Sequence, residues 1–179
     1  PSSRSSCASF SGDETPILAS DIHSVVLNPP WNVPTSIASK ELWPKEKASP
    51  GYLKRNGFIV ISNGEGSSRL QQRAGPQSSL GRFKFDFENP YGVYLHDTPA
   101  QTGFARYARQ ASHGCVRLEK PAALAAALLE GSPDWNPDKI AATVAKGETV
   151  RAAQIFDFFA GEAPRLAAAC SYTGSRRRI

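Results

Sequence analysis

An alternation of aromatic and charged residues constrains the fold of this chain more than any other feature. Residues 83–88 read Phe-Lys-Phe-Asp-Phe-Glu, so every second side chain is aromatic. Successive side chains of a strand point to opposite faces of a sheet, so this pattern predicts a strand with one buried face. The turn sequence Asn-Pro-Tyr-Gly follows at residues 89–92, and residues 93–95 then predict the partner strand of a hairpin. The chain is therefore expected to build a sheet that is apolar on one side.

Two other apolar segments also predict strands. His23–Leu27 is a β-branched run that stops where Asn28 is followed by two prolines. Phe58–Ser62 is apolar over almost its whole length. Residues 63–79 come next and are polar with several glycines, so we expect a long loop there, of the kind that is commonly functional or disordered.

The segment between these two strands carries helix signals. A cap at residues 35–36 predicts a helix that runs to about Leu42 and that Pro44 ends. Ser49 followed by proline resembles a second helix start, and Gly57 lies where a C-terminal glycine cap belongs. Two short helices between strands form either a lid over a site or a purely structural insertion.

Helical patterns also dominate the chain after residue 120. Pro121 opens one predicted helix that Gly131 closes, and Asn136 caps another that ends near Gly147. Strands therefore come first and helices later. This order predicts an α+β, mainly-β domain rather than a doubly wound sheet.

Size and charge set wide limits on function. The chain has 179 residues, which fit a single domain with a real core. Its net charge is +5, and Arg176, Arg177 and Arg178 supply three of the positive charges, which we interpret as a solvated tail. A mildly basic body suits an anionic partner such as cell wall or nucleic acid without choosing between them. No apolar run approaches the roughly 20 residues of a membrane helix, and the start at Pro1 without a leader indicates a mature fragment.

The chain has an odd number of cysteines, at positions 7, 115 and 170. At least one thiol is therefore unpaired within the chain. A Cys7–Cys170 bridge is compatible with the count, but spacing alone does not test its geometry.

The most informative residues surround Cys115. A nucleophilic cysteine needs a thiolate, which a nearby base or positive charge favours. If residues 113–117 are extended, His113, Cys115 and Arg117 share one face, so that a permanent cation lies beside the sulfur. Gly114 leaves room for a substrate backbone, and the amides of Gly114 and Cys115 are candidates to hold an oxyanion. The alternative is a buried structural cysteine, which the polar neighbours on both sides argue against.

His96 is the candidate base for this thiol. It ends the predicted hairpin strand, with Tyr94 on the same face and Asp97 immediately after it. An imidazole at a strand end is well placed to take a proton, and Asp97 can orient it through its side chain or its backbone. The alternative is a histidine that only caps a turn. Zinc binding is not expected, because the three histidines and the cysteine lack the paired short spacings of a structural site.

These segments together resemble one family. Tyr-Leu-His-Asp-Thr-Pro at residues 94–99 and Ser-His-Gly-Cys-Val-Arg at residues 112–117 look like the signature of the L,D-transpeptidase catalytic domain, of the YkuD-type fold. Residues 28–34, 50–53 and 81–87 are similar to landmarks of its large periplasmic branch, which carries an inserted lid. The resemblance covers roughly residues 15–150.

The resemblance implies a β-sandwich-like catalytic domain with peripheral helices, a lid at about residues 35–73 and a periplasmic or cell-envelope location. It implies no cofactor. It also implies an enzyme that releases D-alanine from a tetrapeptide stem of peptidoglycan, forms a thioester, and passes the acyl group to the amine of a second stem or of an anchored lipoprotein. Carbapenems acylate the same cysteine in such enzymes. Residue by residue, it makes Cys115 the nucleophile and His96 the base, Arg117 a stabilising or substrate-binding residue, and it assigns the shape of the site to Ser112, His113 and Gly114.

Both ends of the chain depart from this family. Residues 1–12 do not resemble the expected opening strand, and residues 148–179 read as an Ala- and Arg-rich stretch rather than as further strands. Whether residues 1–14 and 148–179 complete the sheet is therefore left open by the sequence.

Two other functions compete with transpeptidation. If water resolves the thioester, the protein is an L,D-carboxypeptidase or an endopeptidase that trims stems or releases lipoprotein, because pocket shape chooses the acceptor. Alternatively, the chain is a non-catalytic basic domain that binds wall polymer or nucleic acid, with an affinity that salt weakens and that survives Cys115→Ala. No nucleic-acid motif supports the latter. The acceptor and the oligomeric state are left open by the sequence.

Overall fold

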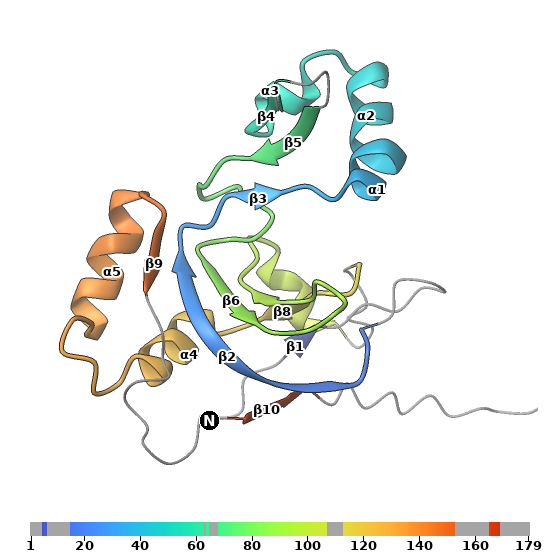
Figure 1. The fold of residues 1–179 in the computed structure, drawn as a ribbon. Coiled ribbons are helices and arrows are strands. Elements are labelled where there is room, and N and C mark those ends of the chain that lie inside the picture. The colour runs from blue at the N-terminus through green and yellow to red at the C-terminus, as the bar shows by residue number, and fades with distance from the viewer. Residues whose placement is uncertain are drawn as a thin grey trace, which may run out of the picture.

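The computed structural model describes residues 5–6, 15–62, 64, 68–106, 113–152 and 165–168. These residues form two sheets and a few short helices, which confirms the predicted α+β, mainly-β class (Figure 1). Among the described residues, no helix combines the length and the apolar character that crossing a membrane requires.

The strands are β1 (Ser5–Ser6), β2 (Leu18–Leu27), β3 (Trp31–Asn32), β4 (Phe58–Ser62), β5 (Ser68–Gln72), β6 (Phe83–Phe87), β7 (Leu95–His96), β8 (Val116–Leu118), β9 (Val150–Ala152) and β10 (Arg165–Ala168). The helical segments are α1 (Thr35–Ile37), a π-helix (Ala38–Leu42), α2 (Trp43–Ala48), α3 (Tyr52–Arg55), a 3-10 helix (Gln101–Ala105), α4 (Pro121–Leu128) and α5 (Pro137–Lys146).

The main sheet has the strand order β1-β8-β7-β6-β2-β10, and β9 also pairs with β2. Every neighbouring pair in this sheet is antiparallel except β7 and β8, which are parallel. A parallel pair needs a long connection, and residues 97–115 supply it. The pairing of β6 with β7 confirms the predicted hairpin, although β7 begins at Leu95 rather than at residue 93.

One face of the main sheet is apolar, as the alternation in β6 predicts. Phe83, Phe85 and Leu95 point into a core cluster that also contains residues of β2, β8, α4 and α5. Phe85 is fully buried. Helix α5 ends at the predicted Gly147, which caps it with a positive φ, whereas α4 already ends at Leu128, before the predicted Gly131. These two helices close the apolar face, so the polar residues of β6 lie on the opposite face.

The second sheet belongs to the segment inserted between β2 and β6. It has three strands, in the order β3-β5-β4, and helices α1 to α3 accompany it (Figure 1). A separate core cluster fills it, made of Val33, Ala38, Leu42, Leu53, Phe58 and Leu70. The insertion therefore has its own apolar interior.

Three local predictions for this insertion are wrong. Residues 35–48 form one continuous helical segment, so Pro44 does not end the helix. Pro44 is tolerated because it lies in the first turn of α2, directly after a π-helical turn, where a missing N–H costs little. Ser49 is not the N-cap of α3, because the Glu46 carboxylate accepts the hydrogen bonds of the Gly51 and Leu53 amides there, at 2.8 Å each. Residues 63–79 are not one loop, because they contain β5, whose polar sequence gave no strand signal.

The sequence left open whether the chain ends complete the main sheet, and their described residues do add strands to it. Strand β1 pairs with β8, and strands β9 and β10 both pair with β2. Short strands of this kind are stabilised by backbone hydrogen bonds to a sheet that already exists, so their own side-chain pattern is weak. Cys7 and Cys170 lie outside the described residues.

Candidate active site

The candidate site is built on the polar face of the main sheet, where β7 and β8 run side by side. Their register pairs Leu95 with Val116 and His96 with Arg117. Leu95 and Val116 are buried in the core, so His96 and Arg117 point to the opposite face. Cys115 comes immediately before β8 and interacts with both Tyr94 and Arg117, which places it at this site.

Tyr94 contacts Cys115 directly. The Val116 amide donates to the Tyr94 carbonyl at 3.1 Å, which aligns the two chains at this point. Both the backbone and the side chain of Tyr94 hydrogen-bond to Cys115. The Tyr94 side chain also hydrogen-bonds to Trp31, the first residue of β3 in the inserted segment. The insertion therefore contacts the residue that lies beside the thiol.

Gly114 bends the chain immediately before Cys115. Its φ of +110° is a conformation that residues with a side chain rarely adopt, and its carbonyl accepts a hydrogen bond from the Thr15 hydroxyl at 2.9 Å. Residues 113–117 consequently do not form one extended run, and β8 begins only at Val116. The geometric reason for expecting His113 on the face of Cys115 and Arg117 therefore does not hold.

His113 instead contacts the inserted segment. Its Nε2 lies 2.7 Å from Oε1 of Glu41 in the π-helix, and its side chain is 47% exposed. Ser112 lies outside the described residues.

His96 is held in one orientation. It is buried, with 5% of its surface exposed, and its Nδ1 lies 2.5 Å from the Asp97 carbonyl oxygen. A carbonyl can only accept a hydrogen bond, so Nδ1 carries a proton and, in the neutral ring, Nε2 is the acceptor. An edge contact with the Tyr94 ring, with centroids 5.8 Å apart, further fixes the imidazole. His96 therefore presents the nitrogen that a general base needs.

The Asp97 carboxylate does not orient His96. It accepts hydrogen bonds from the backbone amides of Arg82 and Thr98, each at 2.7 Å. It also packs against Gly81, where a Cβ atom would lie only 2.3 Å from Oδ2. The sequence predicted that Asp97 orients the imidazole through either its side chain or its backbone, and in the structure its backbone carbonyl makes the contact.

The thiol and the imidazole are both neutral at rest. Burial, together with the positive charges of Arg117 and Lys84, lowers the pKa of His96 to about 4, against the opposing effect of its hydrogen bond to the Asp97 carbonyl. Burial raises the pKa of the Cys115 thiol above its usual range, although hydrogen bonds from Tyr94 and the charges of Lys84 and Arg117 oppose this. The site is therefore not a preformed pair of thiolate and imidazolium.

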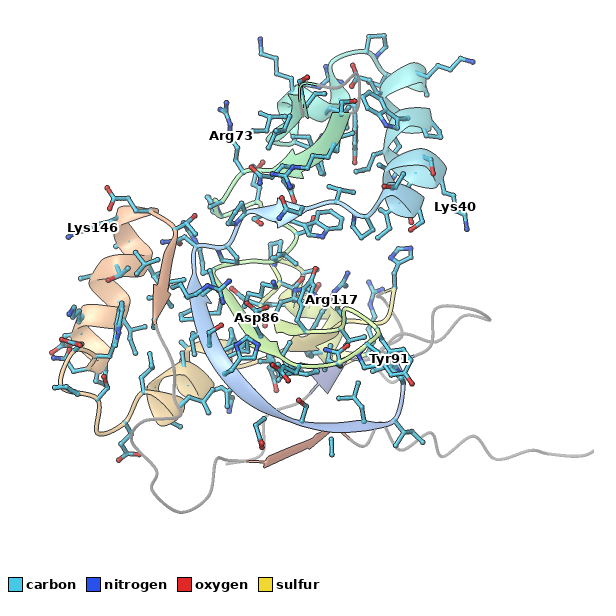
Figure 2. The ribbon with its side chains drawn as sticks, in the orientation of Figure 1. Lys40, Arg73, Asp86, Tyr91, Arg117 and Lys146 are labelled. Atoms are coloured by element: carbon cyan, nitrogen blue, oxygen red, sulfur yellow. The ribbon has the colours of Figure 1, made fainter. Side chains whose placement is uncertain are left out.

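Arg117 is the predicted cation beside the sulfur. It lies on the main sheet, as Asp86 does (Figure 2), and interacts electrostatically with Cys115. Its Nε is buried and, among the described residues, has no hydrogen-bond partner. A buried donor of this kind is ready to donate a hydrogen bond to a ligand oxygen.

Sequence reasoning missed two residues of this site, Lys84 and Trp31. The alternation in β6 placed Lys84 opposite the phenylalanines, but only the pairing of Lys84 with His96 brings it to the site. Trp31 belongs to a proline-rich segment with no local signal of a contact. Among the described residues, no cluster of three or more His, Cys, Asp or Glu side chains is suited to hold a metal ion.

Comparison with known proteins shows the family of the chain. The family model described as the L,D-transpeptidase catalytic domain, YkuD, matches residues 5–150. A Haemophilus influenzae protein named "Putative L,D-transpeptidase" is 34% identical over 155 residues, which are 77% of this chain. The match spans 31% of that protein's length, so this chain corresponds to about a third of it. The chain belongs to the family of L,D-transpeptidase catalytic domains.

Proposed function

We propose that this chain is the catalytic domain of an L,D-transpeptidase that cross-links peptidoglycan in the cell envelope, with Cys115 as nucleophile and His96 as general base. The observation that carries the proposal is the parallel register of β7 and β8. It brings His96 and Arg117 to one face, and Tyr94 beside Cys115. Family membership supports the reaction class.

Acylation begins with transfer of the Cys115 thiol proton to Nε2 of His96. The sulfur attacks the carbonyl carbon of the amide between the diamino acid and the terminal D-alanine of a tetrapeptide stem. The amides of Gly114 and Cys115 stabilise the oxyanion that develops. The C–N bond then breaks, His96 returns the proton to the leaving nitrogen, and D-alanine departs. A thioester on Cys115 is left.

The second half-reaction passes the acyl group to an amine. The side-chain amine of another stem attacks the thioester carbon, His96 takes the proton from that nitrogen, and the C–S bond breaks. The sulfur then regains its proton, which restores the neutral pair. The Arg117 guanidinium binds a carboxylate of the stem, a role for which its buried Nε is suited, since it has no hydrogen-bond partner in the part of the chain that the structure describes. Tyr94, Ser112 and His113 shape the site.

The inserted segment serves as a lid in this proposal. Its contacts with the site run through Trp31 to Tyr94 and through Glu41 to His113. A cover that excludes water favours attack by an amine over hydrolysis of the thioester. Hydrolysis is the competing activity, and it would make the enzyme an L,D-carboxypeptidase.

Two experiments test the proposal. Intact-mass analysis after incubation with a carbapenem is expected to show one adduct, which Cys115→Ala abolishes while the circular dichroism spectrum stays unchanged. An adduct on another residue would refute the assignment of the nucleophile. Incubation with a tetrapeptide stem, with and without an amine acceptor, then separates the activities. Cross-linked product is expected with the amine, whereas a shortened stem alone would identify a hydrolase.

A further inference from the structure

Lys84 occupies a central position on the polar face of the main sheet. Its strand β6 pairs with β7 so that Lys84 lies opposite His96. Its Nζ lies 4.4 Å from the centroid of the Tyr94 ring and 2.6 Å from Oδ1 of Asp86. The side chain is 23% exposed. The ammonium group is therefore fixed between a carboxylate and the aromatic ring that contacts Cys115.

The partner of Lys84 is itself fixed from two other strands. Oδ2 of Asp86 accepts a hydrogen bond at 2.9 Å from the Arg151 guanidinium on β9. The same Arg151 nitrogen also bonds to the Ser24 hydroxyl on β2. Lys84 and Arg151 together lower the pKa of Asp86 against the opposing effect of burial. Asp86 is therefore ionised, and it holds Lys84 on the face of the sheet that carries the thiol.

The charge of Lys84 acts on both reacting groups. It opposes the effect of burial on the pKa of the Cys115 thiol, and it adds to the effect of burial on the pKa of His96. A positive charge stabilises a thiolate and destabilises an imidazolium. The two effects keep His96 unprotonated, so that it can accept a proton, and make the thiol a better proton donor. Arg117 is the other cation that acts on both groups.

We propose that Lys84 is a positioning residue of the active site, which places a fixed positive charge beside Cys115 and His96 and holds the Tyr94 ring against the thiol. Asp86 and Arg151 position Lys84 for this task. The inference rests on the proposed roles of Cys115 and His96. The alternative is a structural lysine that serves only to pair with Asp86.

Lys84→Gln separates these alternatives, because the amide still donates to Asp86 but carries no charge. Two measurements are made that need no substrate. The rate of Cys115 alkylation by iodoacetamide is followed against pH, and the His96 C2 proton is titrated by NMR, with its resonance assigned through His96→Asn. Because neither uses stem peptide, failure of the proposed reaction would leave this test intact.

The expected result is a shift of both titrations to higher pH in Lys84→Gln. Loss of the charge raises the pKa of the thiol and the pKa of His96, so alkylation near neutral pH slows, by roughly three- to tenfold. Lys84→Arg is expected to restore both titrations toward those of the wild type. Lys146→Gln is the matched control, since it removes the same charge from the exposed end of α5 (Figure 2).

Two results would overturn the proposal. Unchanged titrations in a folded Lys84→Gln variant would show that the charge has no role at the thiol. Equal shifts in Lys84→Gln and Lys146→Gln would show a response to net charge alone. If Lys84→Gln does not fold, wild type is compared with Lys84→Arg instead. Arginine keeps the positive charge, so both titrations should stay close to those of the wild type. A titration in Lys84→Arg that moves to the value found in the denatured protein would contradict a role of the charge.

Discussion

The His113 imidazole and the Glu41 carboxylate lie 2.7 Å apart, which joins the loop before Cys115 to the π-helix of the inserted segment. The two residues are separated by more than seventy positions in the sequence. Trp31 and Tyr94 make a second contact between the same two parts of the molecule. The inserted segment is therefore attached directly to the loop and the strand that carry the reactive side chains.

Breaking the contact between Glu41 and His113 is expected to loosen the proposed lid without unfolding the protein. Glu41→Gln should change the free energy of unfolding by less than about 1 kcal/mol, because both side chains are partly exposed. Hydrogen exchange at residues 35–48 should become faster, and a larger share of the thioester should be hydrolysed instead of passing to an amine. Glu130→Gln, on an exposed residue after α4, is the control. Equal exchange rates in Glu41→Gln and Glu130→Gln would show that the contact between Glu41 and His113 does not hold the inserted segment in place.

Acidification is expected to destabilise the fold through His96. Its pKa is lowered from 6.5 to about 4 in the folded protein. Between these two values the unfolded chain binds a proton that the folded protein does not, so the free energy of unfolding falls as pH decreases through this window. The loss of unfolding free energy is on the order of 1.4 kcal/mol for each unit of pH. The full stabilisation is present above the pKa that His96 has in the unfolded chain.

Urea unfolding at a series of pH values between about 4 and 7 measures this slope. His96→Asn should flatten it, because asparagine does not titrate. A slope that is the same in wild type and variant would show that His96 is not the group responsible.

Gly81 is expected to tolerate no side chain. Its φ is +61°, and a Cβ atom would lie 2.3 Å from Oδ2 of Asp97. Gly81→Ala should therefore lower the free energy of unfolding by about 1–3 kcal/mol and displace the Asp97 carbonyl that orients His96. Acylation by a carbapenem should slow accordingly.

Gly75→Ala provides the matched control, because a Cβ atom there meets nothing within 4 Å and no positive φ is required. Chemical denaturation and the acylation rate are measured on both variants. If Gly81→Ala behaves like Gly75→Ala, the contact between Gly81 and Asp97 does not fix the catalytic geometry.

The Tyr94 hydroxyl is expected to promote ionisation of the thiol. Its hydrogen bond to Cys115 lowers the pKa of that thiol, so Tyr94→Phe should raise it and slow alkylation at neutral pH by several-fold. The phenyl ring remains, so the fold should be kept. Tyr91→Phe removes a hydroxyl from a side chain that is 64% exposed and should leave the alkylation rate unchanged (Figure 2). Faster alkylation in Tyr94→Phe would show that the hydroxyl shields the sulfur instead.

Local patterns in the sequence predicted several elements correctly. The alternation at residues 83–88 gave β6 and its apolar face, because the period of a strand is read directly from neighbouring residues. Asn136 and Gly147 marked the ends of α5 for the same reason, since caps depend on residues within one turn. The Asn136 side chain accepts a hydrogen bond from the Lys139 amide at 2.8 Å.

Local patterns failed where a distant partner decides the outcome. Strand β5 is polar, and it forms because Val60 and its neighbours in β4 offer backbone groups to pair with. Strands β9 and β10 are fixed by β2, which lies more than a hundred residues earlier in the chain. Pro44 ended the predicted helix, but a preceding π-helical turn allows the chain to continue. In the three strands tertiary context overrides propensity, whereas at Pro44 the backbone of the preceding turn does so.

The sequence by itself determined which chemical groups the site has: a thiol, an imidazole and a guanidinium, on segments with recognisable motifs. Only the tertiary structure decided how these groups are arranged. The parallel register of β7 and β8 sets which side chains are neighbours, and the pairing of β6 with β7 brings Lys84 to the same face. The backbone carbonyl of Asp97, rather than its carboxylate, orients the imidazole. Such choices depend on strand register and burial, which arise from contacts between residues far apart in the chain and leave no local trace in the sequence.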